Sequence, residues 1–475
     1  MSASTDRSAW VAAAIRALAG FACLFPFILC AAAVEERVVI LANARQPESV
    51  ALARFYAEQR GIPEANLLAL PLPEEETISW RQFIDQVWQP VQDELYRRGW
   101  IEGTASSLID RLGRRRYAFT AHRISFLVTC RGVPLRIQND PTLLGPHNGR
   151  KILEPFNRNE GAVDAELSLV ALGNHEITGL VGNPLFAQTG PLTLDAAQVV
   201  KVSRLDGPTW ESARHLVTAA REAERTGLVG RQYVDLKGPH ADGDTWLRAA
   251  HEQLDRLGFD GEVEETPAIF SAEARFDAPV FYFGWYADTL GGPFSRAGFA
   301  FPAGAVAIHI HSFSAQTLHS ATSGWCGPLV ARGVTATVGN VFEPYLEFTH
   351  RPNLLLRALS EGRNFGDAVF YALPALSWQG IAVGDPLFRP FKVTLAEQLA
   401  RVRTLVPAQA AYVWLRQAGL LEQRGQNKEA AAAFRMAQRS AELAEDARLA
   451  EGVARRLARL ESGAAENGDT PLVVK

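Results

Sequence analysis

The sequence predicts an α/β protein made of two consecutive α/β halves, with a small helical segment after them. Short apolar runs alternate with helical stretches between residues 36 and 393. This alternation is typical of a mostly parallel sheet with helices on both faces. From about residue 395 the composition changes to Ala, Arg, Glu, Gln and Leu at helical spacing, which predicts a separate α-helical part.

The first half covers residues 36–195. Gly61 and Pro63 end its first helix, because glycine favours helix C-termini and proline cannot continue a helix. In chain order we expect a strand at 37–41, a helix at 50–60, a strand at 67–70, a helix at 80–98 and a strand at 124–129.

The second half covers residues 196–393 and repeats the alternation. Gly258 stands behind its second helix, and Gly284 ends its third strand. In chain order we expect a strand at 199–202, a helix at 208–225, a strand at 233–235, a helix at 244–257, and strands at 280–283, 305–310 and 334–338.

The segment 395–461 has the spacing of one tetratricopeptide repeat. Small residues occur where two helices would touch, and Gly425 falls in the turn between them. One repeat cannot bury its apolar face alone, so this segment must pack on the α/β part, be capped by the last helix, or bind a partner. We expect the tail, 462–475, to be disordered.

The N-terminal residues 1–33 have the layout of a secretory signal peptide. Arg7 and Arg16 precede an apolar run that ends in three alanines at 31–33, a typical cleavage site. The alternative is an uncleaved membrane anchor, for which the run is marginal in length. The prediction is an exported protein, periplasmic or secreted, that meets a membrane only through this segment if it stays uncleaved.

Composition limits the possible partners. The chain has 475 residues, a net charge of −4 and a pI of about 6.2, so nucleic acid is not an expected partner. No cofactor is expected. Four cysteines exclude a disulfide scaffold. Cys130 and Cys326 either pair or are two buried thiols, and we favour the thiols.

Four segments with polar residues are candidate sites. Three of them follow expected strands of the second half, and the fourth lies near the end of that half. In a parallel sheet, functional residues gather at the carboxyl ends of the strands, so these segments are the candidate sites. They are Gly284-Trp285-Tyr286-Ala287-Asp288, His309 to Ser314, Gly339 to Tyr345, and Gly384-Asp385-Pro386-Leu387.

Five short motifs resemble the signature of an uncharacterised family of exported bacterial proteins, associated with exosortase-type protein sorting. The resemblance covers about residues 36–393 and leaves out the helical C-terminus. The motifs are Asn183-Pro184-Leu185, Ser203 to Pro208 (SRLDGP), Ser312 to Ala315 (SFSA), Glu343-Pro344-Tyr345 and Gly384 to Leu387 (GDPL).

At longer range the order of motifs resembles gingipain-type, caspase-fold cysteine peptidases, which implies two tandem three-layer halves. In that group one strand ends in the catalytic His and the next in the nucleophilic Cys. Here Trp285 stands at the His position, and Ser312 or Ser314 at the Cys position. Because a hydroxyl needs an adjacent base to act as a nucleophile, peptidase activity by the usual dyad is not expected.

The remaining candidates each have a functional and a structural interpretation. Catalytic candidates are Ser312, Ser314 and His311, and binding candidates are Trp285, Tyr286, Asp288, Glu343 and Arg204. His309 and His311 share one strand face; they are core histidines or, with Asp288 or Glu343, a metal site. The serines otherwise cap a helix, Glu343 fixes a loop, and Asp385 is a turn residue.

Four charged residues also have a structural interpretation. Arg204 and Asp206 form a buried ion pair in this interpretation. Asp164 and Glu166 are two residues apart on an expected helix, so they do not face each other, and we interpret them as a solvated face.

Two functions follow. The first is a degenerate, peptidase-like binding or scaffold protein of the cell envelope, with a peptide or protein partner docked through the C-terminal helices. The alternative is a peptidase-like hydrolase that uses Ser312 or Ser314, or a His-based metal site. Hydrogen bonding of either serine to a histidine or carboxylate at an accessible position favours the hydrolase.

Overall fold

The computed structural model describes residues 33–144, 153–172 and 175–462. The predicted signal peptide and the predicted disordered tail therefore lie outside the described residues, apart from Ala33 and Ser462. Among the helices of the described residues, none is long and apolar enough to cross a membrane.

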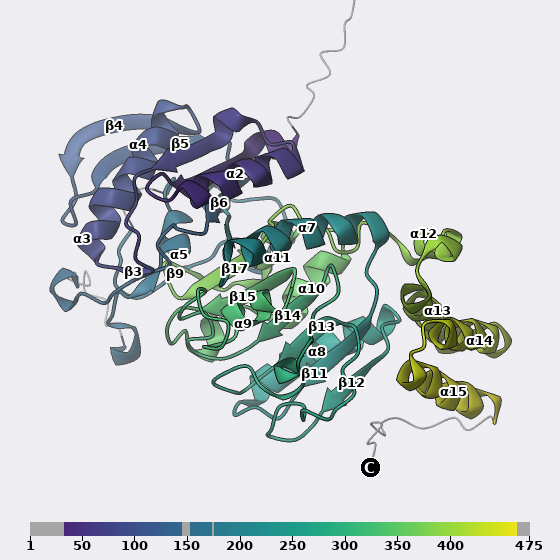
Figure 1. Cartoon of the computed structure of the whole chain (residues 1–475). Helices are drawn as coiled ribbons and strands as arrows, with labels where there is room; N and C mark the ends of the chain where they lie inside the picture. The colour runs from purple at the N-terminus through teal and green to yellow at the C-terminus, as the bar shows by residue number, and fades with distance from the viewer. Residues whose placement is uncertain (1–32, 145–152, 173–174, 463–475) are drawn as a thin grey trace, which may run out of the picture. The chain divides into compact units, whose positions relative to one another are not determined.

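The fold is mixed α/β around one large, mostly parallel sheet of ten strands (Figure 1). All neighbouring strands are parallel except one pair, β15 and β17. Across the sheet the order is β12 (Gly261–Glu264), β11 (Arg231–Asp235), β13 (Pro279–Gly284), β14 (Val306–His309), β15 (Ala336–Asn340), β17 (Gly380–Gly384), β10 (Val202–Leu205), β6 (Phe126–Cys130), β1 (Val38–Asn43) and β2 (Leu67–Leu70).

The inner strands are apolar along their whole length, as expected for strands covered on both faces. Every residue of β1, β6, β13 and β15 is buried. Edge strands differ: β12 has the sequence Gly-Glu-Val-Glu and is only half-buried. The strong apolar runs of the sequence therefore mark the centre of the sheet.

The same strand order occurs twice. In one part β2 lies outside β1 and β6 lies on its other side; in the other part β12 lies outside β11 and β13 lies on its other side. The two parts run in opposite directions and join through the antiparallel pair β15–β17. The expected boundary at 195/196 assigns β10 to the second half, whereas its hydrogen-bonded neighbours are β6 and β17.

Helices form two packed sets around the sheet (Figure 1). In one set α2 (Pro47–Arg60) packs on α7 (Trp210–Thr226), which contacts α9 (Cys326–Ala331). In the other, α8 (Ala241–Arg256) packs on α10 (Pro352–Ser360) and α10 on α11 (Phe365–Ala372), while α5 (Val163–Leu167) lies against β10 and β17. The short helix α6 spans Leu194–Gln198.

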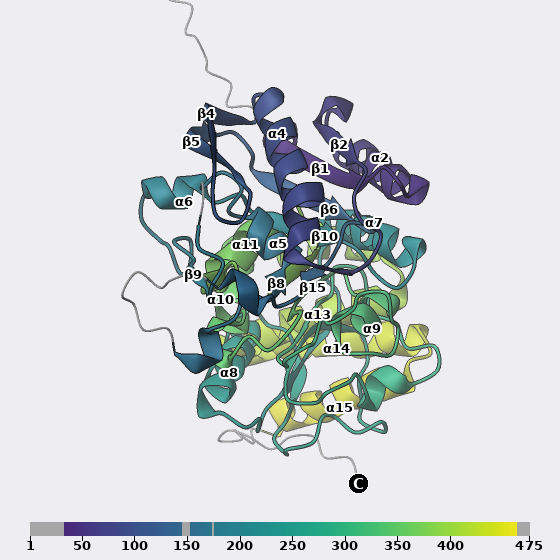
Figure 2. The same ribbon diagram turned by 90° about the vertical axis from the view of Figure 1, so that its left-hand side faces the viewer.

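The helix expected at 80–98 exists but is not uniform. It comprises α3 (Trp80–Gln82), a π-helical stretch (Phe83–Trp88) and α4 (Gln89–Arg97). Beside α4 lies a separate antiparallel hairpin, β4 (Ile101–Ile109) and β5 (Arg115–His122) (Figure 2). This hairpin was not predicted from the sequence.

Several strands were missed or shifted. The strand expected at 199–202 lies at 202–205, and β12 and β17 were not predicted. Small sheets are completed by β3 (Thr77–Ile78), β7 (Arg136–Ile137) and β8 (Gly161–Ala162), and by β9 (Val181–Gly182) with β16 (Ala375–Leu376).

The C-terminal segment is helical, as predicted. It contains α12 (Leu395–Ala400), α13 (Pro407–Gln423), α14 (Asn427–Leu443) and α15 (Ala447–Glu461). Small and apolar side chains such as Ala411, Ala430 and Phe434 form its core. It also packs on the α/β part: the Tyr412 hydroxyl donates to Asp277 at 2.7 Å, and the Arg416 guanidinium lies 4.1 Å from the ring centre of Phe259.

Candidate functional site

The carboxyl ends of β13, β14 and β15 meet at one edge of the sheet because these strands are parallel. Five predicted residues lie in the loops that follow them. Tyr286 and Asp288 follow β13, His311 and Ser312 follow β14, and Glu343 follows β15. We call these five residues the strand-end cluster.

His311 binds the loop after β13. Its Nε2 lies 3.0 Å from Asp288 Oδ1, and its ring centre is 4.3 Å from that of Tyr286. Its Nδ1 lies 2.5 Å from the main-chain oxygen of Ser312. Both partners are hydrogen-bond acceptors, so neither ring nitrogen is positioned as a base for the Ser312 hydroxyl.

Ser312 pairs with a carboxylate instead. Its Oγ donates to Glu343 Oε2 at 2.5 Å. The other oxygen of Glu343 accepts the main-chain N–H of Tyr345 at 2.9 Å, so Glu343 also fixes the loop after β15. Both side chains belong to half-exposed residues. The serine that sequence analysis placed at the nucleophile position thus has a possible base beside it.

Ser314 is not accessible. It is 1% exposed, and its Oγ accepts the main-chain N–H of Asn340 at 3.0 Å. Its carbonyl accepts the N–H groups of Trp325 and Cys326 at the start of α9. Ser314 therefore joins the loop after β14 to β15, and the structure separates it from the strand-end cluster.

Trp285 fills the space above the junction of β11 and β13. Its indole Nε1 donates to Asp244 Oδ1 at 2.8 Å, and the side chain is buried. A Cβ added at Gly238 or Gly243 would lie 2.1 or 2.0 Å from indole atoms. Only glycine therefore allows the ring to lie here.

This junction is a topological switch point, where parallel α/β sheets usually bind ligands. The equivalent point between β1 and β6 is also filled. There the Asn43 side-chain amide donates to the carbonyls of Pro73 and Gly132. The side chains of Trp285 and Asn43 therefore lie at the two switch points and are held there by hydrogen bonds.

His309 is a core histidine. Its Nε2 accepts the N–H of Ala287 at 2.9 Å, and its Nδ1 lies 2.9 Å from the Tyr282 hydroxyl. Its ring stacks on Trp325 at 3.5 Å. Burial holds the pKa of His309 well below its usual value. With both nitrogens engaged, His309 is not positioned to share a metal ion with His311.

The described residues give no support for a metal centre: no group of three or more His, Cys, Asp or Glu among them is arranged to hold a metal ion. Behind His309 lies Asp235, which sequence analysis missed. Its Oδ2 accepts from the Tyr282 hydroxyl at 3.3 Å, and burial raises the pKa of this carboxyl to about 8.

Arg204 lies apart from the strand-end cluster, at the carboxyl end of β10. It is fully buried and donates to Asp164 at 2.7 and 2.9 Å, to Asp206 at 3.3 Å and to the carbonyls of Val133 and Pro134. The expected ion pair with Asp206 is present. A fully engaged, buried guanidinium is a structural group and does not face a ligand.

The interpretation of Asp164 and Glu166 as a solvated face is wrong. Both are buried, because every residue of α5 is enclosed. Glu166 lies 2.7 Å from His175 Nε2 and accepts from the Ser377 hydroxyl at 2.5 Å. Sequence spacing showed that the two carboxylates do not face each other, but it could not show that each has its own buried partner.

Asp385 and the two described cysteines are structural. Asp385 accepts the N–H of Leu387, as a turn residue does, and also binds Tyr56 and Arg60 in the interior. Cys130 and Cys326 are both free and buried, as favoured from the sequence. Burial raises the pKa of the Cys326 thiol to about 12, which keeps it protonated and unreactive.

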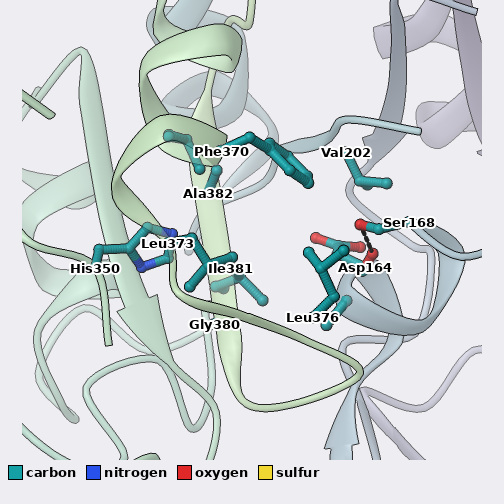
Figure 3. Close-up of a pocket in the computed structure, with 12 residues that line it drawn as sticks. Asp164, Ser168, Val202, His350, Phe370, Leu373, Leu376, Gly380, Ile381 and Ala382 are labelled. Carbon is teal, nitrogen blue, oxygen red and sulfur yellow. Dashed lines mark hydrogen bonds between the residues drawn. The ribbon is translucent and has the colours of Figure 1, made fainter. Parts of the chain in front are cut away.

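A small cavity lies between β17, α5 and α11 (Figure 3). Asp164 and Ser168 line one side and His350 the other. Its volume is about 10 Å³, which is space for one water molecule and not for a substrate. Burial lowers the pKa of His350 to about 3, so this side chain is neutral in the folded protein.

In comparisons with known proteins, no family model, no curated protein and no solved structure matches the chain.

Proposed function

We propose that this chain is an exported cell-envelope protein that binds a peptide or protein and does not cleave it, with a degenerate gingipain-like arrangement of two α/β halves. The strand order that occurs twice in the sheet supports the two-half arrangement. The helical packing of α13 and α14 around small side chains supports a tetratricopeptide-like segment.

The observation that carries the proposal is the position of Trp285. The resemblance to gingipain-type peptidases places the catalytic His here, but the indole is packed against Gly238 and Gly243 and hydrogen-bonded to Asp244. Ser314, one of two residues at the nucleophile position, is buried. The space and the groups for Cys–His chemistry are therefore both lost.

The same edge of the sheet offers a binding surface. Tyr286 is 44% exposed, Phe313 is 42% exposed, and the Asp288 side chain is 91% exposed. Exposed aromatic rings beside a carboxylate favour contact with a peptide, since aromatic side chains supply large contact areas at low entropic cost. The strand-end cluster is thus the proposed binding site.

The test combines labelling and binding on the folded protein. Serine-directed fluorophosphonate and cysteine-directed iodoacetamide probes are expected to give no labelling. A fluorescent peptide library is expected to yield binders that Tyr286→Ala weakens, while Tyr96→Ala, a partly exposed tyrosine on α4, leaves binding unchanged. Labelling at Ser312, or equal binding by both variants, contradicts the proposal.

A second function is favoured by one distance, the 2.5 Å between Ser312 Oγ and Glu343 Oε2. In this alternative Glu343 accepts the proton of Ser312 as the Oγ attacks an acyl carbon, and it returns that proton to the leaving group when the bond between the acyl carbon and the leaving group breaks. Fluorophosphonate labelling that is lost in both Ser312→Ala and Glu343→Gln, but retained in His311→Gln, would support the hydrolase. Labelling that persists in Ser312→Ala would exclude this role for the serine.

A further inference from the structure

The outermost strand of the sheet, β12, has one free edge. Among the residues that the structure describes, β12 pairs only with β11. The carbonyls of Asp260 and Glu264 accept from β11, through the N–H groups of Gln232 and Leu236. Since successive main-chain groups of a strand point to opposite sides, the N–H and C=O groups of Gly261 and Val263 point away from the sheet.

This free edge lines a groove. The opposite wall comes from α13 and α15, and the volume is about 1180 Å³. In Figure 1 β12 is the strand of the sheet nearest to these helices. The edge residues Gly261 and Val263 are among its lining, and the apolar part of the lining consists of Phe259, Leu415, Leu449, Val453 and Leu460.

Half-buried ion pairs connect the two walls. Arg456 of α15 donates to Asp260, before β12, at 2.5 Å and to Glu422 of α13 at 2.9 Å. Arg231 of β11 donates to the same Asp260 at 2.6 Å. The groove is therefore held by hydrogen-bonded charges that tie the helices to the sheet edge.

The lining of the groove is mixed, because charged side chains such as Arg231, Glu262 and Arg456 surround the apolar ones. The outward-facing main-chain groups of β12, with an apolar patch on the opposite wall, are suited to an extended polypeptide. Such a segment adds a strand to the edge through main-chain hydrogen bonds, and its alternate side chains enter the apolar lining. An edge left open would instead invite pairing with other chains. The outward-facing edge of β12 beside this apolar patch thus favours an added strand.

One segment of this chain fits. Leu460 and Arg459, near the end of α15, line the groove, so the residues that follow them are tethered at its rim. Residues 463–469 (GAAENGD) can span up to about 25 Å. After them come Thr470-Pro471-Leu472-Val473-Val474-Lys475, in which Leu472 to Val474 favour a β-strand.

We propose that residues 472–474 occupy the groove as an added strand, hydrogen-bonded to the free edge of β12 at Gly261 and Val263. Leu472 and Val474 share one face of this strand and contact the apolar lining. The tether gives the segment a millimolar effective concentration at the groove. This inference does not depend on the proposed function of the strand-end cluster.

The first test compares two full-length proteins, the wild type and L472D/V474D, in binding a fluorescent peptide Thr-Pro-Leu-Val-Val-Lys. The double variant is expected to bind the peptide at least about tenfold more tightly, because its own segment no longer competes. Glu466→Gln, in the tether, is the matched control and should behave as the wild type. Equal binding by wild type and double variant, or no binding by either, overturns the proposal.

The second test measures amide hydrogen exchange at the free edge of β12. The N–H groups of Gly261 and Val263 are expected to be protected in the wild type and to exchange at least about tenfold faster in L472D/V474D. Protection must be unchanged over an about hundredfold range of protein concentration. Protection that rises with concentration means that a second copy fills the groove, and unprotected amides in the wild type mean that nothing does; both results overturn the proposal.

Discussion

The guanidinium of Arg204 and the carboxylate of Asp164 form a two-pronged ion pair, with Nε–Oδ2 at 2.9 Å and Nη2–Oδ1 at 2.7 Å. The pair joins β10, near the middle of the sheet, to α5. Both side chains are excluded from water. A buried pair of this kind adds little net stability by itself, but the loss of one partner leaves an uncompensated charge.

Arg204→Ala is therefore expected to lower the free energy of unfolding by about 3–5 kcal/mol. Urea unfolding followed by circular dichroism measures it. Arg81→Ala is the control, because Arg81 pairs with Asp85 at the surface and should change stability by at most about 0.5 kcal/mol. A double variant R204M/D164N should recover part of the loss, since it removes both charges; no recovery would show that the charges are not the cause.

Trp285→Ala is expected to cost about 3–5 kcal/mol of stability, because it leaves a cavity over Gly238 and Gly243 and removes the hydrogen bond from the indole to Asp244. Differential scanning calorimetry measures the change. Tyr286→Ala, one residue further on and half-exposed, should cost far less. Equal losses for the two variants would mean that Trp285 does not fill the switch point.

Asp235 should give the protein a distinct pH dependence. Its folded pKa of about 8 lies above the unfolded value of about 3.9, so the folded state binds the extra proton. Its contribution to stability is complete below about pH 4 and is lost as pH rises to about 8, with a slope of up to about 1.4 kcal/mol per pH unit.

The measurement is the difference in unfolding free energy between the wild type and Asp235→Asn from pH 4 to pH 9. The unfolding free energy of the wild type minus that of Asp235→Asn should fall as pH rises and level off above about pH 8, because only the wild type loses the stabilising proton. Glu264 and Tyr282 face Asp235 and remain in both proteins. Their own effects on the unfolding free energy are therefore largely removed when the two proteins are compared. A difference independent of pH would contradict the raised pKa.

His350 should give stability a pH dependence of the opposite sign. Burial lowers its folded pKa to about 3, below the unfolded value of about 6.5, so stability is lost as pH falls from about 6.5 towards 3. His350→Leu is expected to reduce acid sensitivity, seen as a lower midpoint in acid unfolding. His215→Leu on the exposed face of α7 serves as control and should leave the midpoint where it is.

Some of the fold followed directly from the sequence. The central strands β1, β6 and β13 were predicted because a strand buried on both faces must be apolar throughout. The edge strand β12 and the hairpin β4–β5 carry polar residues on exposed positions, so no continuous apolar run marks them. The π-helical turn at Phe83–Trp88 left no local signal either.

Part of the candidate site was also predicted, because strand geometry alone places some of its residues. Parallel strands bring their carboxyl ends to one edge, so Asp288, His311 and Glu343 were expected to be neighbours. The burial of Ser314 and the engagement of His309 depend on how the loop after β14 crosses to α9 and β15. Such a path is decided by tertiary packing, which spacing along the chain does not contain.

The antiparallel junction of β15 and β17 has a consequence for how the chain can fold. Strand β17 is made last among the ten strands, yet it lies in the middle of the sheet between β10 and β15. Until it is synthesised and inserted, β10 and β15 each present an open edge. The N-terminal strands β1, β2, β6 and β10 therefore keep one unpaired sheet edge until the last of the ten strands has been synthesised.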